Sequence, residues 1–400
     1  MKYIVSVVRI SVGLLFIFSG LVKANDPMGL SYKMQEFFEV WGLHGFNGIT
    51  LLMSVLMNSF EIIAGVALLI GWQIRLFIWL LLALILFFTF LTGYTVFTGK
   101  PKNCGCFGDC LPVTSFTSFM KDLVLLVMIV FLLFKIRYIK AVSTLKPAAV
   151  YILVSAFFCV AFQWYTLNYL PVIDCLPFKK GNNISEKMKM PANAVPDSTV
   201  ITFVYKKDGR EVEFTADKFP ADFSKDTYEF VKRYDKLVRA GKNNEPPIKG
   251  FNLSGISNTD STEHVLAQPY CLLLIAEKLP GKGVWIHNLE QLNKIAMTKN
   301  IPAYIITSFP KEAREIAITN NLNNIQVFTC DYKAIQTASR ADMCIYLLKK
   351  GTVINKLSGR EMSNMKDELL QVSVQERPVA TPQISITDSI NAADSLLIGK

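Results

Sequence analysis

The stretch LFIWLLLALILFFTFLTGYTV, residues Leu76–Val96, carries no charged side chain. A helix needs about 20 consecutive, mainly apolar residues to cross a bilayer, and this stretch has that length. Four more runs of the same kind lie around it: Tyr3–Val22, Thr50–Ile70, Phe116–Phe134 and Ala148–Tyr169. We therefore predict five transmembrane helices in the part of the chain that precedes Pro171.

The composition divides the chain into two parts. Of its 400 residues, 51% are hydrophobic and 18% are charged, whereas about 25% of the residues in a soluble domain are charged. The apolar excess lies before Pro171, and the remainder has the composition of a soluble domain. The net charge of +10 fits lysines and arginines that anchor helix ends. No basic run is interleaved with aromatic residues, which argues against nucleic acid as a partner.

The short loops predict the orientation, because Lys and Arg are enriched in cytoplasmic loops. One set of loop ends carries Lys2, Arg75, Lys135, Arg137, Lys140 and Lys146. The opposite loops carry fewer basic residues, namely Lys23, Lys33, Lys100 and Lys102. We predict a bacterial inner-membrane protein with a cytoplasmic N-terminus and a periplasmic region after Leu170. The first run is too long for a secretory signal peptide and contains Arg9.

Three ionisable residues interrupt the apolar runs: Arg9, Glu61 and Asp122. Such groups face the interior of a helix bundle and pair with one another. Arg9 and Glu61 differ in depth by roughly 6 Å at ~1.5 Å rise per residue, so we predict an ion pair between them. The alternative is a protonatable Glu61 at a substrate or quinone site. Asp122, with Lys121 beside it, lies near the outer end of its run and is expected to cap the helix or to pair there.

Cys104, Cys106 and Cys110 fall within one outer loop that is rich in Gly and Pro. A redox-active thiol pair is one interpretation, since exchange needs a thiolate, a second sulfur within reach and access for a partner. A structural disulfide is the second, because disulfides persist outside the cytoplasm. A closed zinc site wants four ligands, and the nearest outer histidine is His44, so we predict no metal. Cys106–Cys110 and Cys110–Cys175 are both sterically easier pairs than Cys104–Cys106.

A family resemblance adds to this picture. The first run resembles the opening motif of the DoxX family of membrane proteins in the residues Arg9-Ile-Ser-Val-Gly13 through Ser19-Gly20-Leu-Val-Lys23-Ala-Asn-Asp26-Pro27-Met-Gly29. The second run is similar to that family's second helix in the residues Glu61-Ile-Ile-Ala-Gly65-Val-Ala-Leu-Leu-Ile-Gly71. Cys104-Gly-Cys106-Phe-Gly108, followed by Lys121-Asp122, resembles the MauE branch of redox-associated membrane proteins. The resemblance covers about residues 1–140 and implies a four-helix transmembrane bundle linked to disulfide formation or maturation of a periplasmic partner. Cys110 is not part of that pattern.

The soluble half begins with a predicted hairpin. Val200–Lys206 and Glu211–Phe214 alternate in polarity around Asp208-Gly209, a dipeptide that favours tight turns. A helix is expected over Lys225–Ala240. Beyond it, strands at Tyr270–Ala276, Pro302–Thr307 and Ile325–Thr329 alternate with helices at Asn288–Thr298, Lys311–Asn320 and Tyr332–Ala338. A hairpin, Cys344–Lys349 and Val353–Leu357, and a closing helix, Glu361–Leu370, complete a predicted α/β layered domain.

This order resembles a thioredoxin-like fold over about residues 247–371, with Pro247-Ile-Lys-Gly-Phe251-Asn-Leu similar to that family's opening strand. The resemblance does not extend to the residues that carry the family's thiol chemistry. A Cys-x-x-Cys should follow the first core strand, yet Glu277-Lys-Leu-Pro-Gly stands there, and Met343 occupies the place of the usual cis-proline. We therefore expect a degenerate domain that binds or docks. Cys271, Cys330 and Cys344 lie on apolar strands and are predicted to be buried free thiols.

The predicted organisation is an all-α membrane region followed by an α/β soluble region. It comprises a DoxX/MauE-like bundle (1–140), a fifth transmembrane helix (141–170), a linker (171–195), a hairpin-plus-helix subdomain (196–246), a degenerate thioredoxin-like domain (247–371) and a disordered tail (372–400). This arrangement resembles DoxX-family proteins of Bacteroidetes that carry a C-terminal periplasmic domain.

The predicted function is redox-linked. Cys104, Cys106 and Cys110 would exchange disulfides with a periplasmic protein partner or pass electrons to a membrane carrier such as a quinone. If the chain is an enzyme, it is a membrane thiol–disulfide oxidoreductase. The alternatives are a non-enzymatic scaffold subunit of an envelope complex with a structural disulfide, and a small-molecule transporter. The absence of internal repeats disfavours the transporter.

Overall fold

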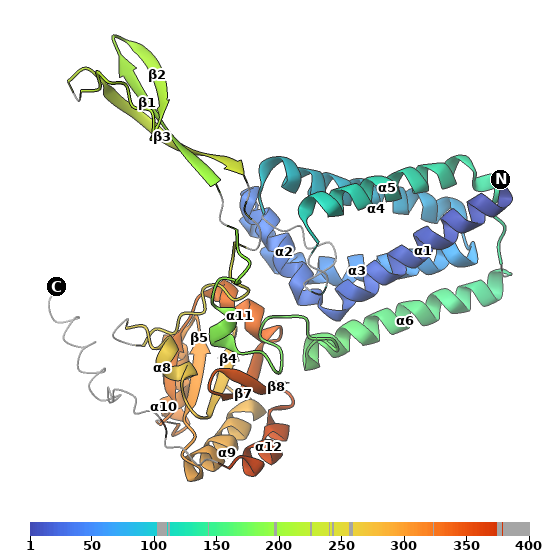
Figure 1. Cartoon of the computed structure of the whole chain (residues 1–400). Coiled ribbons are helices and arrows are strands. Elements are labelled where there is room, and N and C mark those ends of the chain that lie inside the picture. The colour runs from blue at the N-terminus through green and yellow to red at the C-terminus, as the bar shows by residue number, and fades with distance from the viewer. Residues whose placement is uncertain are drawn as a thin grey trace.

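The computed structural model describes residues 1–101, 110, 113–142, 144–195, 198–224, 226–239, 241, 244–255, 259–322, 324–373 and 378. It consists of a helical bundle, an α/β domain and a three-stranded sheet that projects away from both (Figure 1). We call the projecting sheet the wing and define it as residues 198–239.

Within these residues, five helices are long and apolar enough to cross a membrane. They are α1 (Lys2–Asn25), α3 (Thr50–Ile70), α4 (Ile74–Thr98), α5 (Ser115–Phe134) and α6 (Leu145–Tyr169). They lie side by side in Figure 1, with α1 packed along α3, α4 along α5 and α3 along α6. The five predicted runs are therefore confirmed as helices. A short 3-10 turn, η2 (Ile136–Tyr138), follows α5.

Helices α1 and α3 approach closely because small residues face each other. A Cβ atom added at Gly65 would lie 2.7 Å from the carbonyl oxygen of Gly13, and one added at Gly20 would lie 2.6 Å from the Ile62 side chain. Small residues at such contacts allow the backbones of membrane helices to pack against each other. The antiparallel register that results sets Gly13 beside Gly65 and Gly20 beside Ile62.

We expect Gly65→Ala to destabilise the bundle by about 1–3 kcal/mol, the usual cost of overpacking, because the new methyl group meets the backbone carbonyl of Gly13 as well as the Ile17 side chain. The measurement is the unfolding midpoint of the full chain in detergent. Gly48→Ala is the matched control, since nothing lies within 4 Å of a Cβ at that position. Equal midpoints for the two variants would contradict the close contact.

Between α1 and α3 the chain forms an additional helix, α2 (Pro27–Val40), and a 3-10 turn, η1 (His44–Ile49). The Asp26 side chain accepts a hydrogen bond from the Gly29 amide at 2.9 Å and so caps α2. Leu30, Met34 and Phe37 are buried along one face of this helix. Helix α2 was not predicted from the sequence, and it contacts the α/β domain through Tyr32 and Glu39.

The α/β domain is built on a sheet with the strand order β6-β5-β4-β7-β8. The strands are β4 (Cys271–Ala276), β5 (Ala303–Thr307), β6 (Gln326–Thr329), β7 (Met343–Lys349) and β8 (Thr352–Ser358). β4, β5 and β6 run parallel, and the β7–β8 hairpin continues the sheet in antiparallel fashion. Every residue of β4 is buried, as expected for a strand covered on both faces.

Helices cover both faces of this sheet. α9 (Val284–Thr298), α10 (Pro310–Thr319) and α12 (Met365–Gln371) contribute to one hydrophobic core, and α12 follows the 3-10 turn η3 (Met362–Asn364). α8 (Thr262–Leu266) and α11 (Tyr332–Ser339) contribute to the other. These elements agree with the predicted α/β alternation. The similarity of residues 247–371 to a thioredoxin-like fold stays a prediction, and the expected opening strand at residues 247–253 is not formed.

The segment after α6, predicted to be a linker, is instead part of the α/β domain. Phe178 and Ile184 are almost fully buried in its core, and Ile184 lies in the short helix α7 (Ile184–Lys187). The amide of Gly181 donates to the Val353 carbonyl at 2.8 Å, and the amide of Ile184 donates to that of Gly351 at 2.8 Å. Because the segment is mostly polar, its few buried apolar residues were not recognised from the sequence.

The wing has the strand order β2-β1-β3. β1 (Ser198–Lys207) and β2 (Arg210–Thr215) form the predicted hairpin, and both turn residues, Asp208 and Gly209, have positive φ angles. The helix predicted over Lys225–Ala240 is wrong. Glu229–Arg239 forms strand β3, antiparallel to β1, because pairing with β1 places Phe230 against the Tyr205 ring. Lys225 and Ala240 lie outside the described residues.

Candidate functional site

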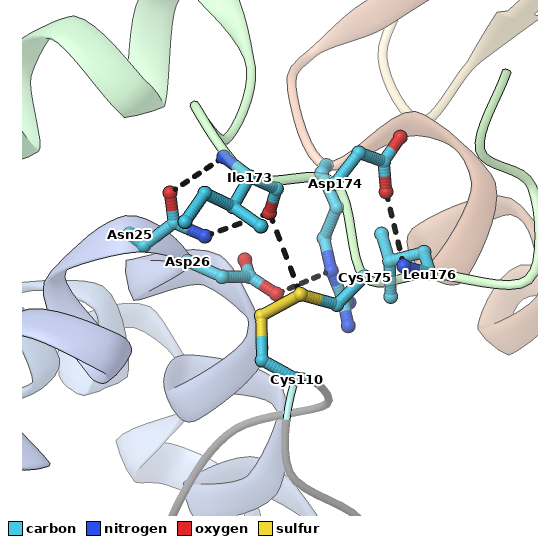
Figure 2. Close-up of a disulfide and its surroundings, with 8 residues drawn as sticks. Asn25, Asp26, Cys110, Ile173, Asp174, Cys175 and Leu176 are labelled. Atoms are coloured by element: carbon cyan, nitrogen blue, oxygen red, sulfur yellow. Dashed lines mark hydrogen bonds and ion pairs between the residues drawn. A yellow bond between two sulfur atoms is a disulfide. The ribbon is translucent and has the colours of Figure 1, made fainter.

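The cysteine loop is joined to the segment after α6 by a disulfide between Cys110 and Cys175, whose Cα atoms are 4.8 Å apart (Figure 2). Both residues are partly exposed. This is one of the two pairings that the sequence analysis left open. Cys104 and Cys106, the other candidate thiols, lie outside the described residues.

The disulfide lies where the bundle meets the α/β domain. Beside it, the Asn25 side chain donates to the Ile173 carbonyl at 2.9 Å and accepts from the Ile173 amide at 3.0 Å. The Asp26 carboxylate forms an ion pair with Arg340 of α11 at 2.9 Å. Polar contacts from the end of α1 therefore hold the backbone next to Cys175 in place.

Glu277, directly after β4, forms the centre of a second contact between bundle and domain. It is 7% exposed. Tyr32 of α2 donates a hydrogen bond to its Oε2 atom at 2.7 Å, and Tyr332 donates to its Oε1 atom at 2.5 Å. Burial, together with the Glu277 charge, raises the pKa of Tyr32 well above its usual value and that of Tyr332 to about 12. Both phenols therefore remain protonated donors at any ordinary pH.

A cleft of about 520 Å³ opens between α2 and α11. Cys175, but not Cys110, contributes to its wall. We call it the interdomain cleft; its other lining residues include Lys33, Glu36, Glu39, Glu245, Pro246, Pro247, Lys249, Lys333, Gln336, Thr337 and Arg340. One residue of the disulfide therefore borders a cavity of ligand size.

The predicted Arg9–Glu61 pair is wrong. Glu61 forms an ion pair with Lys23, and the two side chains are 1% and 2% exposed. Arg9 instead donates to the backbone carbonyl of Lys140 at 2.9 Å. The register of α1 and α3 explains the difference, because Gly20 lies beside Ile62 and so brings the last turn of α1 to Glu61.

Asp122 is fully buried and lies 2.8 Å from the Lys121 ammonium, while Thr92 donates to it at 3.1 Å. Lys121 and Asp122 share one small cavity with Lys23 and Glu61. Its volume of about 20 Å³ matches a single water molecule. Two carboxylates and two amines thus surround a space of the size of one water molecule. A water in that space could pass protons between these four groups.

From the sequence alone, Lys23 was assigned to a loop and was not identified as the partner of Glu61. The signal was present, since Val12, Phe16, Ser19 and Lys23 recur at helical spacing and are all buried. Cys271, Cys330 and Cys344 are buried free thiols, as predicted. Burial raises the pKa of Cys330 and of Cys344 to about 12, so neither is a ready nucleophile. Within the described ranges, no three His, Cys, Asp or Glu side chains come together to hold a metal ion.

Comparison with known proteins adds two matches. Residues 1–135 match the family model of the methylamine utilisation protein MauE, which supports a MauE-like membrane family for the bundle. Residues 199–240, which cover nearly all of the wing, match the model of a domain of unknown function, DUF8463. No curated protein and no solved structure matches the chain.

Proposed function

We propose that this chain is an inner-membrane thiol–disulfide exchange protein of the DoxX/MauE type, and that its exchangeable bond is Cys110–Cys175. The observation that carries the proposal is the position of this bond, whose two residues are partly exposed and of which Cys175 belongs to the wall of the interdomain cleft. The MauE match over the bundle supports a redox-related membrane role. The α/β domain, with Glu277 in the place of a Cys-x-x-Cys, serves as the thioredoxin-like docking partner of the bundle.

The exchange needs no group beyond the reacting sulfurs. A thiolate of the periplasmic partner attacks one sulfur of Cys110–Cys175; a mixed disulfide forms, the old bond breaks, and the leaving sulfur takes up a proton. A second thiol of the partner then attacks the mixed disulfide. The partner leaves with a disulfide, and Cys110 and Cys175 are left as a dithiol. Exchange with the disulfide of an oxidised periplasmic carrier restores the Cys110–Cys175 bond and leaves that carrier as a dithiol.

The bundle cavity does not fit a quinone as electron acceptor. Its volume of about 20 Å³ is far below the several hundred Å³ of a site for a cofactor-sized molecule. We therefore assign Lys23, Glu61, Lys121 and Asp122 to bracing the bundle and to holding protons near its outer end. The proposed orientation places the N-terminus in the cytoplasm and the cleft in the periplasm.

A structural clamp is the second candidate function. The disulfide spans 65 residues of sequence, and it joins the loop before α5 to the domain beside the Asp26–Arg340 and Tyr32–Glu277 contacts. A scaffold subunit of an envelope complex would use these contacts to hold the domain in one orientation. In that case the disulfide stays oxidised throughout the life of the protein.

The redox state of Cys110 and Cys175 in native membranes distinguishes the two. Cells are quenched with acid, free thiols are labelled with a mass tag, and the pattern is compared after mild reductant and mild oxidant. We expect wild type to move between an oxidised and a reduced population, and Cys110→Ser/Cys175→Ser to lose this change. The Cys159→Ser variant is the matched control, because Cys159 is a buried free thiol. A pair that stays oxidised under all conditions supports the clamp instead.

A further inference from the structure

We infer that the interdomain cleft is the substrate site of this exchange, that its substrate is an extended polypeptide segment with a cysteine, and that the incoming sulfur attacks Cys175 rather than Cys110. The inference rests on the proposed function and adds the class of substrate and the sulfur attacked. It is drawn from the lining, the charge and the size of the cleft.

The choice of sulfur follows from the geometry. Cys175 contributes to the wall of the cleft together with its neighbours Leu176 and Pro177, whereas Cys110 does not line it. In Figure 2, Cys110 lies toward the bundle side of the bond and Cys175 toward the domain side. Attack through the cleft therefore forms a bond between the incoming sulfur and Cys175 and breaks the bond to Cys110. Cys110 leaves as a thiolate with the electron pair and takes up a proton from solvent.

The charges in the cleft favour an uncharged chain over a small anionic thiol. Each cation in its wall is already paired with a carboxylate. Lys33 lies 3.0 Å from Glu36, Lys333 lies 3.2 Å from Glu39, and Arg340 lies 2.9 Å from Asp26. Lys249 is paired in the same way with Glu245. A cleft with its cations neutralised offers no site of net positive charge to anchor an anion.

The same side chains suit a polypeptide backbone. Lysine and glutamine groups offer donors and the glutamates offer acceptors, which are the two kinds of partner that successive main-chain carbonyls and amides need. The volume of about 520 Å³ lies in the range of sites that enclose ligands of several hundred daltons, and so accommodates several residues of an extended chain. Pro246 and Pro247, which also line the cleft, have no amide N–H that would compete with the peptide for the glutamate acceptors.

The test uses the full chain in detergent micelles, with Cys104 and Cys106 replaced by serine so that only the Cys110–Cys175 bond reacts. The probe is a short biotinylated Gly/Ser peptide with one cysteine thiol. N-ethylmaleimide, added as a quench, blocks the released protein thiol and preserves the mixed disulfide. We expect mass spectrometry to find the peptide on Cys175 and the maleimide on Cys110.

Filling the cleft supplies the second arm. Thr337→Trp in α11 and Glu36→Trp in α2 place bulk on opposite walls, and Thr319→Trp on the exposed end of α10 is the matched control. We expect the two cleft variants to slow the reaction with the peptide roughly tenfold or more, with the control unchanged. Reduction by dithiothreitol, a small neutral thiol, should proceed at the wild-type rate in all three, and an unchanged unfolding midpoint shows that each variant is folded.

Peptide attached to Cys110, or cleft variants that react as fast as Thr319→Trp, would overturn the inference while leaving the proposed function intact. The same holds if dithiothreitol opens the bond in wild type and the peptide does not. If neither thiol opens the bond in the folded protein, the proposed function fails, and this inference fails with it.

Discussion

Glu61→Ala is expected to destabilise the bundle by about 3–5 kcal/mol, the usual effect of leaving one partner of a buried ion pair uncompensated. Lys23 would keep its ammonium over the Phe88 ring at 4.3 Å but would lose the carboxylate with which it is paired. The double variant Lys23→Met/Glu61→Leu should recover most of this loss, because an apolar pair of similar volume needs no compensation.

The measurement is the unfolding midpoint in mixed detergent micelles, with Arg9→Met as the matched control. Arg9 is only partly buried and bonds to a backbone carbonyl, so its removal should have a small effect. If Arg9→Met were as destabilising as Glu61→Ala, the pairing of Glu61 with Lys23 would be contradicted in favour of an Arg9–Glu61 pair.

Phe178→Ala is expected to destabilise the α/β domain by about 3–5 kcal/mol, as large-to-small changes of buried aromatic residues do. Phe178 is 1% exposed and its ring packs edge-on against that of Phe251 at 5.3 Å between centroids. The change would leave a cavity between the segment after α6 and the core of the domain.

Hydrogen exchange of the full chain provides the measurement, followed through the amides of β4 and β7. Val172→Ala is the matched control, because Val172 lies in the same segment but is 60% exposed, and surface changes of this kind stay within about 0.5 kcal/mol. Unchanged protection of the sheet in Phe178→Ala would mean that the segment is a linker after all.

The parts of the fold that were predictable are those in which one local signal dominates. Apolar runs of membrane-spanning length predict the five long helices. Shorter continuous hydrophobic runs predict the buried strands β4 and β5. The Asp208-Gly209 turn fixes the hairpin of the wing, because both positions require positive φ angles.

The elements that were missed depend on partners far away in the sequence. Glu229–Arg239 is rich in charged residues and was predicted to be helical. Only its pairing with β1 makes it a strand. α2 did carry local signals, with Asp26 as its cap and Pro27 at its first position. Its place in the structure, however, is set by contacts with residues more than two hundred positions later, such as Tyr32 with Glu277 and Asp26 with Arg340.

The candidate site shows the same division. The spacing of the cysteines in the outer loop was enough to predict them as site residues. The pairing of Cys110 with Cys175 could not be predicted in the same way, because it depends on how α6 packs against the bundle. Ion pairs were similarly underdetermined. Arg9 could reach Glu61 by depth, but the glycine contacts between α1 and α3 select Lys23.

The wing leaves and returns to the α/β domain at nearly the same point. The amide of Ile248, after the wing, donates to the carbonyl of Lys187, before it, at 3.0 Å, and the first residue of β1 pairs with the last of β3. In topological terms the wing is an insertion. Joining Lys187 to Ile248 across this short span would remove it without interrupting any helix or strand that the structure describes in the α/β domain.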